Sequence, residues 1–79
     1  MIETMRKPTT FEKFAYDKLV EDRLYLLRKA AELVDQGKPS IEVIEALAGD
    51  QVLIGIWLFF AANYMIVTGI RPEGSVNNG

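Results

Sequence analysis

The chain has 79 residues and a net charge of −2, and it contains neither cysteine nor histidine. A chain of this length forms one domain at most, and it is marginally stable unless self-association, a partner or a bilayer supports it. The missing residue types exclude disulfides, thiolate zinc sites, iron–sulfur clusters and the usual haem ligation.

The first nine residues form an N-terminal arm without the apolar stretch that a secretory signal requires. We therefore expect the N-terminal part of the chain to remain in the compartment where it is made. At the end of the arm, Thr9 precedes Glu12 by three residues, which is the spacing of a capping box. This spacing predicts that a helix begins here.

Residues 10–50 have the pattern of an amphipathic helical region. No residue breaks a helix before Gln36, and Gly37 and Pro39 are typical of a helix end, so the pattern predicts one long helix. Apolar residues spaced four and three apart form one stripe along it: Val20, Leu24, Leu27, Ala31 and Val34. Because the opposite side carries acids and bases together, we expect it to face solvent while the stripe packs on protein.

A short second helix is predicted after this punctuation. Ser40 is suited to cap its start, and Ile41, Ile44 and Leu47 share one face at helical spacing. Gly49 then interrupts the pattern before the next helix.

The segment 31–51 has the spacing of the first half of a helix-turn-helix. The recognition helix of such a motif would begin near Gln51 and would need polar or basic side chains to contact bases and phosphates. The sequence has Val52, Leu53 and Trp57 there instead, and the net charge is negative. We therefore expect no nucleic-acid partner.

The segment 51–70 predicts a helix that is apolar on every side, with no charged residue from Val52 to Ile70. Nineteen residues at 1.5 Å each give about 28 Å, close to the hydrocarbon thickness of a bilayer. However, Trp57 and Tyr64 lie inside the run rather than at its ends, where interfacial anchors belong. The segment is thus either a transmembrane helix or the central helix of an oligomeric bundle.

Two features of this helix are candidates for packing contacts. Small residues alternate with larger ones at heptad spacing and form a predicted helix-packing seam of Gln51, Gly55, Leu58, Ala62, Met65 and Gly69. Asn63 is the only strongly polar side chain within the apolar run. We expect it to hydrogen-bond either across a helix interface or to its own helix backbone.

The predicted fold is therefore all-α. It consists of a long amphipathic helix, a short helix and one long apolar helix, followed by a flexible tail at residues 71–79. Such a helical hairpin would form a bundle completed by oligomerisation, by a partner protein or by a bilayer.

The sequence offers no nucleophile–base pair and no metal-ligand set, so we expect neither an enzyme, nor a cofactor, nor a small-molecule substrate. The first functional hypothesis is a small accessory or assembly subunit of a membrane complex, anchored by residues 51–70 with its N-terminal part in the cytoplasm. The alternative is a soluble cytoplasmic homo-oligomeric bundle that acts as an adaptor or a regulatory interaction protein.

Overall fold

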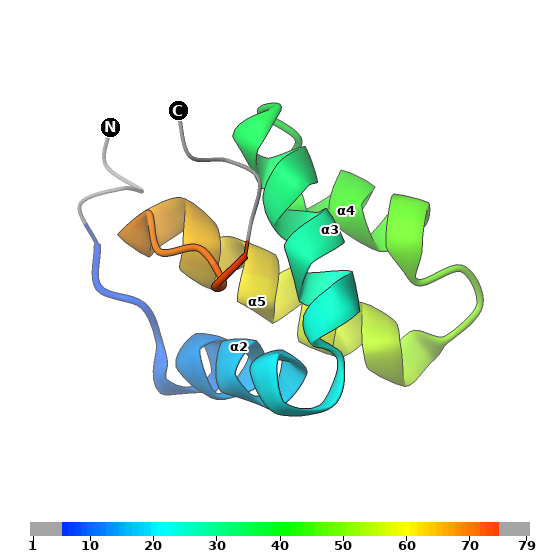
Figure 1. Ribbon diagram of the computed structural model, residues 1–79, viewed down its shortest axis with the longest axis horizontal. Coiled ribbons are helices and arrows are strands. Elements are labelled where there is room, and N and C mark those ends of the chain that lie inside the picture. Colours follow the sequence, from blue (N-terminus) through cyan, green and yellow to red (C-terminus); the bar gives the residue numbers. More distant parts are fainter. Residues whose placement is uncertain (1–5, 75–79) are drawn as a thin grey trace.

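The protein forms four helices and no strand within residues 6–74, the part of the chain that the computed structural model describes (Figure 1). Residues 1–5 of the predicted arm and 75–79 of the predicted tail lie outside it. In chain order the helices are α2 (Thr10–Asp22), α3 (Leu24–Asp35), α4 (Ser40–Leu47) and α5 (Val52–Thr68). The predicted all-α class is confirmed for the described residues.

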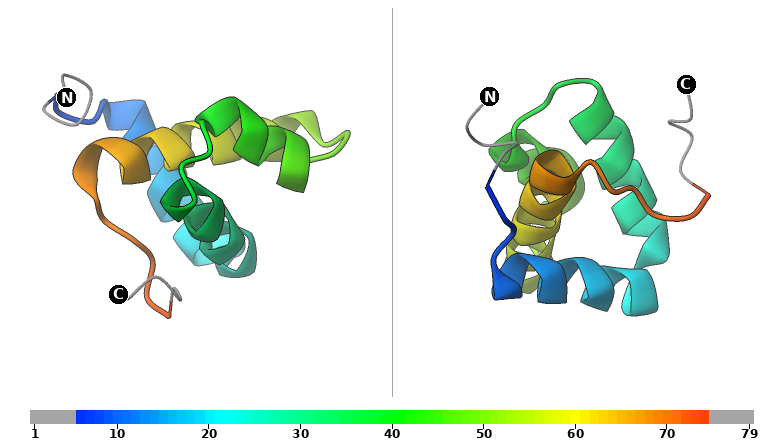
Figure 2. Two further views of the ribbon diagram at one scale, coloured as in Figure 1. Left: turned by 90° about the horizontal axis from the view of Figure 1, so that it is seen from above. Right: turned by 90° about the vertical axis from the view of Figure 1, so that its left-hand side faces the viewer.

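Helix α5 lies in the centre of the fold, and each of the other three helices packs against it. Figure 2 shows α3 on one side of α5, while the opposite side of α5 carries no helix. The core takes apolar side chains from all four helices. Its largest fully buried members are Leu19, Leu27, Val43, Leu58 and Met65. The apolar helix therefore obtains much of its cover from its own chain.

Helix α2 begins at the predicted capping box. The Thr9 hydroxyl accepts a hydrogen bond from the backbone N–H of Glu12 at 3.1 Å, and the Glu12 carboxylate accepts one from the backbone N–H of Thr9 at 2.9 Å. Arg6 also donates to both oxygens of this carboxylate, at 3.0 and 2.8 Å. This bidentate hydrogen bonding holds the pKa of the buried Glu12 carboxyl below its ordinary value.

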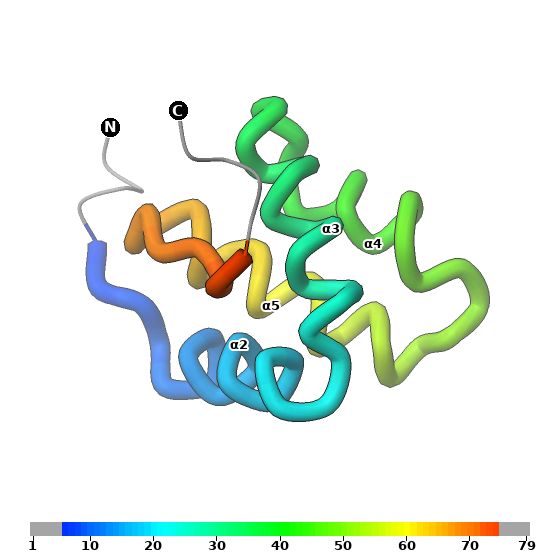
Figure 3. The backbone as a smooth tube through the Cα atoms, viewed as in Figure 1, coloured from blue at the N-terminus to red at the C-terminus, as the bar shows by residue number. Residues whose placement is uncertain are grey.

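The prediction of a single helix from Thr10 to Gln36 is wrong, because the chain turns at Arg23 (φ −146°, ψ 47°). Figure 3 shows α2 and α3 running in different directions from this corner. Helix α2 buries Ala15 and Leu19, which stand four residues apart, so a continuous helix would carry Arg23 into the buried stripe. Burying an unpaired charge is costly. At the turn Arg23 is exposed.

The predicted apolar stripe is divided by this turn. On α3, Leu27, Ala31 and Val34 are buried and Leu24 is half-buried. Val20 is on α2 and is exposed, because the core side of α2 is not the continuation of the core side of α3.

Helix α3 ends at Asp35, and the chain leaves it through the predicted glycine. Gly37 has a φ of 88°, in the left-handed region that glycine adopts without strain. The backbone N–H groups of Gly37 and Lys38 donate to the carbonyls of Val34 and Leu33, at 2.9 and 3.0 Å. These two bonds satisfy carbonyls that have no partner within the helix.

Helix α5 has 17 residues and is shorter than the predicted apolar helix of residues 51–70. Gln51 precedes its first turn, and Gly69, with a φ of 77°, ends it. Among residues 6–74, no helix combines the length and the apolar character needed to cross a membrane. The prediction of a long apolar transmembrane helix is therefore not supported.

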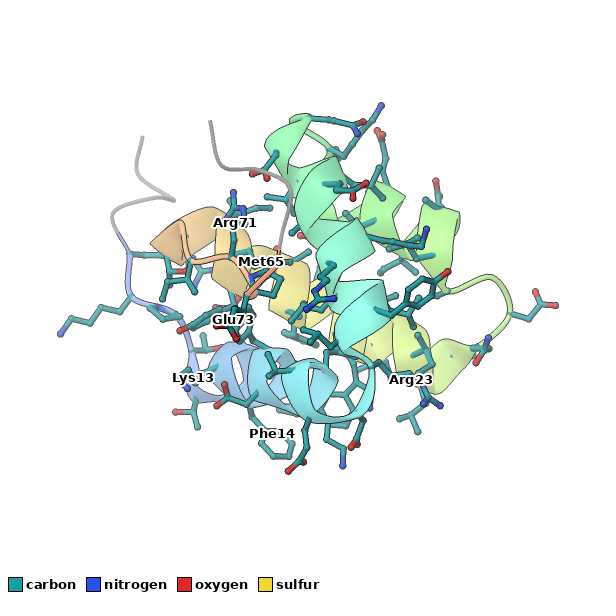
Figure 4. All side chains as sticks on the ribbon, in the orientation of Figure 1. Lys13, Phe14, Arg23, Met65, Arg71 and Glu73 are labelled. Atoms are coloured by element: carbon teal, nitrogen blue, oxygen red, sulfur yellow. The ribbon has the colours of Figure 1, made fainter. Side chains whose placement is uncertain are left out.

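The chain after α5 returns to α3. Arg71 donates from Nε to the Asp35 carboxylate at 2.8 Å and from Nη1 to the carbonyl of Met65 at 2.7 Å. Figure 4 shows the Arg71 and Met65 side chains on the same side of the molecule. Arg71 therefore joins the last turn of α5 to the end of α3, so the predicted tail of residues 71–79 is bound to the helices at its first residue.

Candidate functional site

The predicted helix-packing seam lies mostly inside the chain. Its four central members, Gly55, Leu58, Ala62 and Met65, are buried, and both its ends are exposed. Gly55 contacts α4, since a Cβ placed on it would lie 3.3 Å from Ile44 Cγ2. The small residues thus allow helices of the same chain to approach one another closely.

Asn63 is half-buried, and its side-chain oxygen accepts a hydrogen bond from the Ser40 hydroxyl. Its partner is therefore the first residue of α4, and not the backbone of its own helix. Ser40 does not cap α4 as predicted, because Pro39 occupies the N-cap position. The Ser40 hydroxyl is instead free to tie the start of α4 to the middle of α5.

The acidic side chains of α2 form ion pairs along their own helix. Asp17 binds Lys13 at 2.7 Å, and Asp22 binds Lys18 at 2.9 Å. Within residues 6–74, no three acidic side chains converge to hold a metal ion. The remaining candidates for a site are the exposed apolar residues.

The N-terminal half of α5 exposes large apolar side chains. Val52 is 77% exposed, Leu53 is 64% exposed and Ile56 is 41% exposed. Residues four apart lie on one side of a helix, so Val52, Ile56 and Phe60 form a row, and Leu53 lies beside it. Val52 and Ile56 are exposed, and Phe60, at the end of the row, is half-buried.

Aromatic rings of α2 extend this row. The Phe11 ring centroid lies 4.8 Å from that of Phe60 and 5.6 Å from that of Trp57, and the Phe14 ring lies 5.4 Å from Trp57. Phe11 and Phe14 are themselves exposed, and Figure 4 shows Phe14 pointing away from the fold. We call the surface formed by the exposed side chains the apolar face, and it consists of Phe11, Phe14, Val52, Leu53 and Ile56.

A groove of about 440 Å³ runs beside the apolar face, between α4 and the first half of α5. Its side chains are apolar apart from Gln51, and none is charged. Gly55 contributes to its floor, and Val52 and Ile56 belong to both the groove and the apolar face. The surface thus offers a recess directly beside protruding side chains.

Charged residues border the apolar face at the end of α2. Lys18, Asp22 and Arg23 line a hollow of about 310 Å³ together with Leu53 and Trp57. The Lys18 ammonium donates a hydrogen bond to the Asp22 carboxylate, which raises the pKa of Lys18. The border therefore carries both signs of charge, while the face itself carries none.

The apolar face was not among the predicted site residues. Phe11 and Phe14 lie outside the predicted stripe, and the exposure of Val52 and Leu53 depends on which sides of α5 the other helices cover. The sequence contains one signal of this surface. The two phenylalanines Phe11 and Phe14 lie on the charged side of an otherwise ordinary amphipathic pattern.

Comparison of the chain with protein-family models, with curated proteins and with solved structures finds no match in any of the three.

Proposed function

We propose that the chain is a non-enzymatic interaction module that binds another protein chain through the apolar face. The observation that carries the proposal is the contiguous exposure of large apolar side chains on one side of the fold. A large apolar side chain has roughly 150–200 Å² of surface, so the exposed fractions leave about 450 Å² uncovered. Apolar patches of this size on a small protein are commonly interaction sites.

The chemistry of the border favours protein over lipid or nucleic acid. A surface that binds anionic lipid or a phosphate backbone displays cations without compensating acids. Here Lys18 is bound to Asp22, and the chain as a whole carries a charge of −2. An apolar surface bordered by both charges is typical of a protein interface.

This proposal keeps the accessory or adaptor role expected from the sequence and changes the means of attachment. The apolar residues of α5 serve partly as the core of the fold and partly as the binding surface. No bilayer anchor is needed for this role.

Site-specific photo-crosslinking in the native cell tests the proposal. Benzoylphenylalanine in place of Ile56 positions the reactive group on the apolar face. The matched control places it at Tyr25, which is 67% exposed on α3, the helix on the other side of α5. We expect adducts with protein from position 56 and none from position 25. Equal yields at the two positions, or adducts with lipid alone from position 56, would contradict the proposal.

A further inference from the structure

We infer that the chain bound at the apolar face is a second copy of this protein, in a two-fold dimer with the first halves of the two α5 helices at its centre. This inference rests on the proposed function, because it names the partner of the same surface. It is carried by the shape, the area and the charge of that surface.

The apolar face and the groove beside it have shapes that fit the same surface on a second copy. An interface around a two-fold axis uses the same patch on both copies, so each protruding element needs a recess on the same patch. Val52 and Leu53 protrude, with 77% and 64% of their surface exposed, and the uncharged groove lies beside them. An axis passing near Ile56 brings the protruding side chains of each copy to the groove of the other.

The groove has room for such an insertion. Its volume of about 440 Å³ exceeds that of several aliphatic side chains, and its lining includes Ile44, Phe59 and Phe60. One exposed turn of an apolar helix can therefore enter it without meeting a buried charge.

The area of the surface matches a weak dimer. The apolar face contributes about 450 Å² from each copy, and the lining of the groove and the charged border add to it, so the total reaches about 1,000–1,200 Å². Specific interfaces begin at about this size. We therefore expect a dissociation constant on the order of 10–100 μM rather than an obligate dimer.

The charged side chains at the border of the apolar face can also pair between two copies of the chain. Lys18 and Asp22 lie next to each other at the border of the face, 2.9 Å apart. Around a two-fold axis, Lys18 of one copy can face Asp22 of the other, and the second contact follows by symmetry. A partner with a large net charge would find no matching potential on this border.

Analytical ultracentrifugation of the purified full chain without detergent tests the inference. Between about 1 μM and 1 mM, we expect the mass to rise from 8.9 kDa toward twice that value. In a two-fold dimer, Leu53→Lys or Ile56→Lys adds one charge from each copy to the interface. Each variant should therefore raise the dissociation constant of the dimer at least tenfold. The control Tyr25→Gln changes a side chain of similar exposure on α3 and should dimerise as the unmodified chain does.

The absence of cysteine allows a second measurement that does not depend on destabilising the interface. Ile56→Cys would place two thiols near the axis, where a thiol oxidant such as diamide should join them in a disulfide-linked dimer. Tyr25→Cys should give little dimer under the same conditions. Circular dichroism of every variant verifies that the helices are retained.

The outcomes separate this inference from the proposed function. An unmodified chain that remains a monomer at 1 mM overturns the inference, and so does a dimer that Leu53→Lys and Ile56→Lys leave unchanged. If a monomeric chain still crosslinks from position 56 to a different protein, the inference fails and the proposed function stands. Crosslinks that join position 56 to another copy, with a dimer in the centrifuge, support both.

Discussion

The two halves of α5 have similarly apolar sequences but opposite surroundings. In the second half, Ala61, Ala62 and Met65 have no exposed surface. In the first half, Val52 and Leu53 are among the most exposed large apolar residues of the described chain. Apolar composition alone therefore does not distinguish a core segment from a binding surface.

The difference follows from how the rest of the chain covers the helix. The second half is closed by the contact of Tyr64 with Tyr16 of α2, by the Ser40–Asn63 hydrogen bond to α4 and by the Arg71 contacts at the last turn. The first half packs on α4 through Gly55 and on α2 through Trp57, which contacts Phe11 and Phe14. These contacts leave Val52, Leu53 and Ile56 exposed. An all-round apolar helix in a small fold can thus serve as core and interface at once.

The strongest test of this comparison is truncation to alanine in each half of α5. Met65, in the second half, is fully buried, so Met65→Ala should lower the free energy of unfolding by about 2–4 kcal/mol through lost contacts and a cavity. Leu53→Ala should change it by less than about 0.5 kcal/mol, because the side chain is mostly exposed. Urea unfolding followed by fluorescence of the single tryptophan measures both. Losses of equal size would show that the comparison is wrong. The measurements should be made at a protein concentration of a few micromolar, where the proposed dimer is dissociated.

The next test concerns the contacts that close the second half. Arg71 is largely buried, pairs with Asp35 and donates to the carbonyl of Met65. Arg71→Met keeps much of the side-chain volume and removes these bonds, so we expect a loss of about 1–2 kcal/mol in unfolding free energy.

A matched arginine controls for the general effect of removing a charge. Arg28 is exposed, and its Nε donates to the carbonyl of Glu73 at 2.9 Å. Arg28→Met should cost less than about 0.5 kcal/mol in the same urea measurement. If Arg71→Met loses less unfolding free energy than Arg28→Met, the contacts that the chain makes after α5 do not stabilise the second half of this helix.

Local features of the fold were predictable from the sequence, because each depends on residues close together in the chain. Thr9 and Glu12 form a capping box at the predicted place, and Gly37 follows the end of α3 with a positive φ. Both predictions rest on steric and hydrogen-bonding rules that act within one helical turn.

Features that depend on distant residues were not predictable in this way. The break at Arg23 has no glycine or proline to mark it, and its cause is the burial of neighbouring positions by other helices. Asn63 binds a residue 23 positions earlier in the chain. The apolar face likewise exists because no helix covers one side of α5, which no local pattern could reveal.

A third test concerns the ion pair that anchors the start of α2. Glu12→Gln mimics the protonated acid and can still accept from the backbone N–H of Thr9. It should lower the unfolding free energy at pH 7 by about 1 kcal/mol, because it removes the charge that Arg6 binds.

The pH dependence of this difference has a defined sign. The pKa of Glu12 is lower in the folded chain than its ordinary value, so its contribution is fully present above the ordinary pKa of glutamate and disappears as pH falls through the lowered value. The two proteins should therefore converge in stability as pH falls below the ordinary glutamate pKa of 4.5, in urea titrations at several pH values. A difference that stays constant with pH would mean that the ion pair does not stabilise the fold.

The smallest expected effect lies at the floor of the groove. Gly55→Ala should gain about 0.8–1.0 kcal/mol in helix propensity. The added Cβ would lie 3.3 Å from Ile44 Cγ2 and 3.5 Å from Ala48 Cβ, a tight contact that requires α4 to shift by a few tenths of an ångström. These effects oppose each other, so the net change in unfolding free energy should stay within about 0.5 kcal/mol.

Gly69 supplies the comparison for this substitution. It has open space around it but a φ of 77°, so Gly69→Ala should cost about 1 kcal/mol through backbone strain alone. If Gly55→Ala lowers the unfolding free energy by more than about 1.5 kcal/mol in the urea measurement, α4 cannot shift to make room for the added Cβ. The first half of α5 would then be packed against α4 as rigidly as the second half is packed in the core. The contrast between the halves would be confined to the side of the helix that no other element covers.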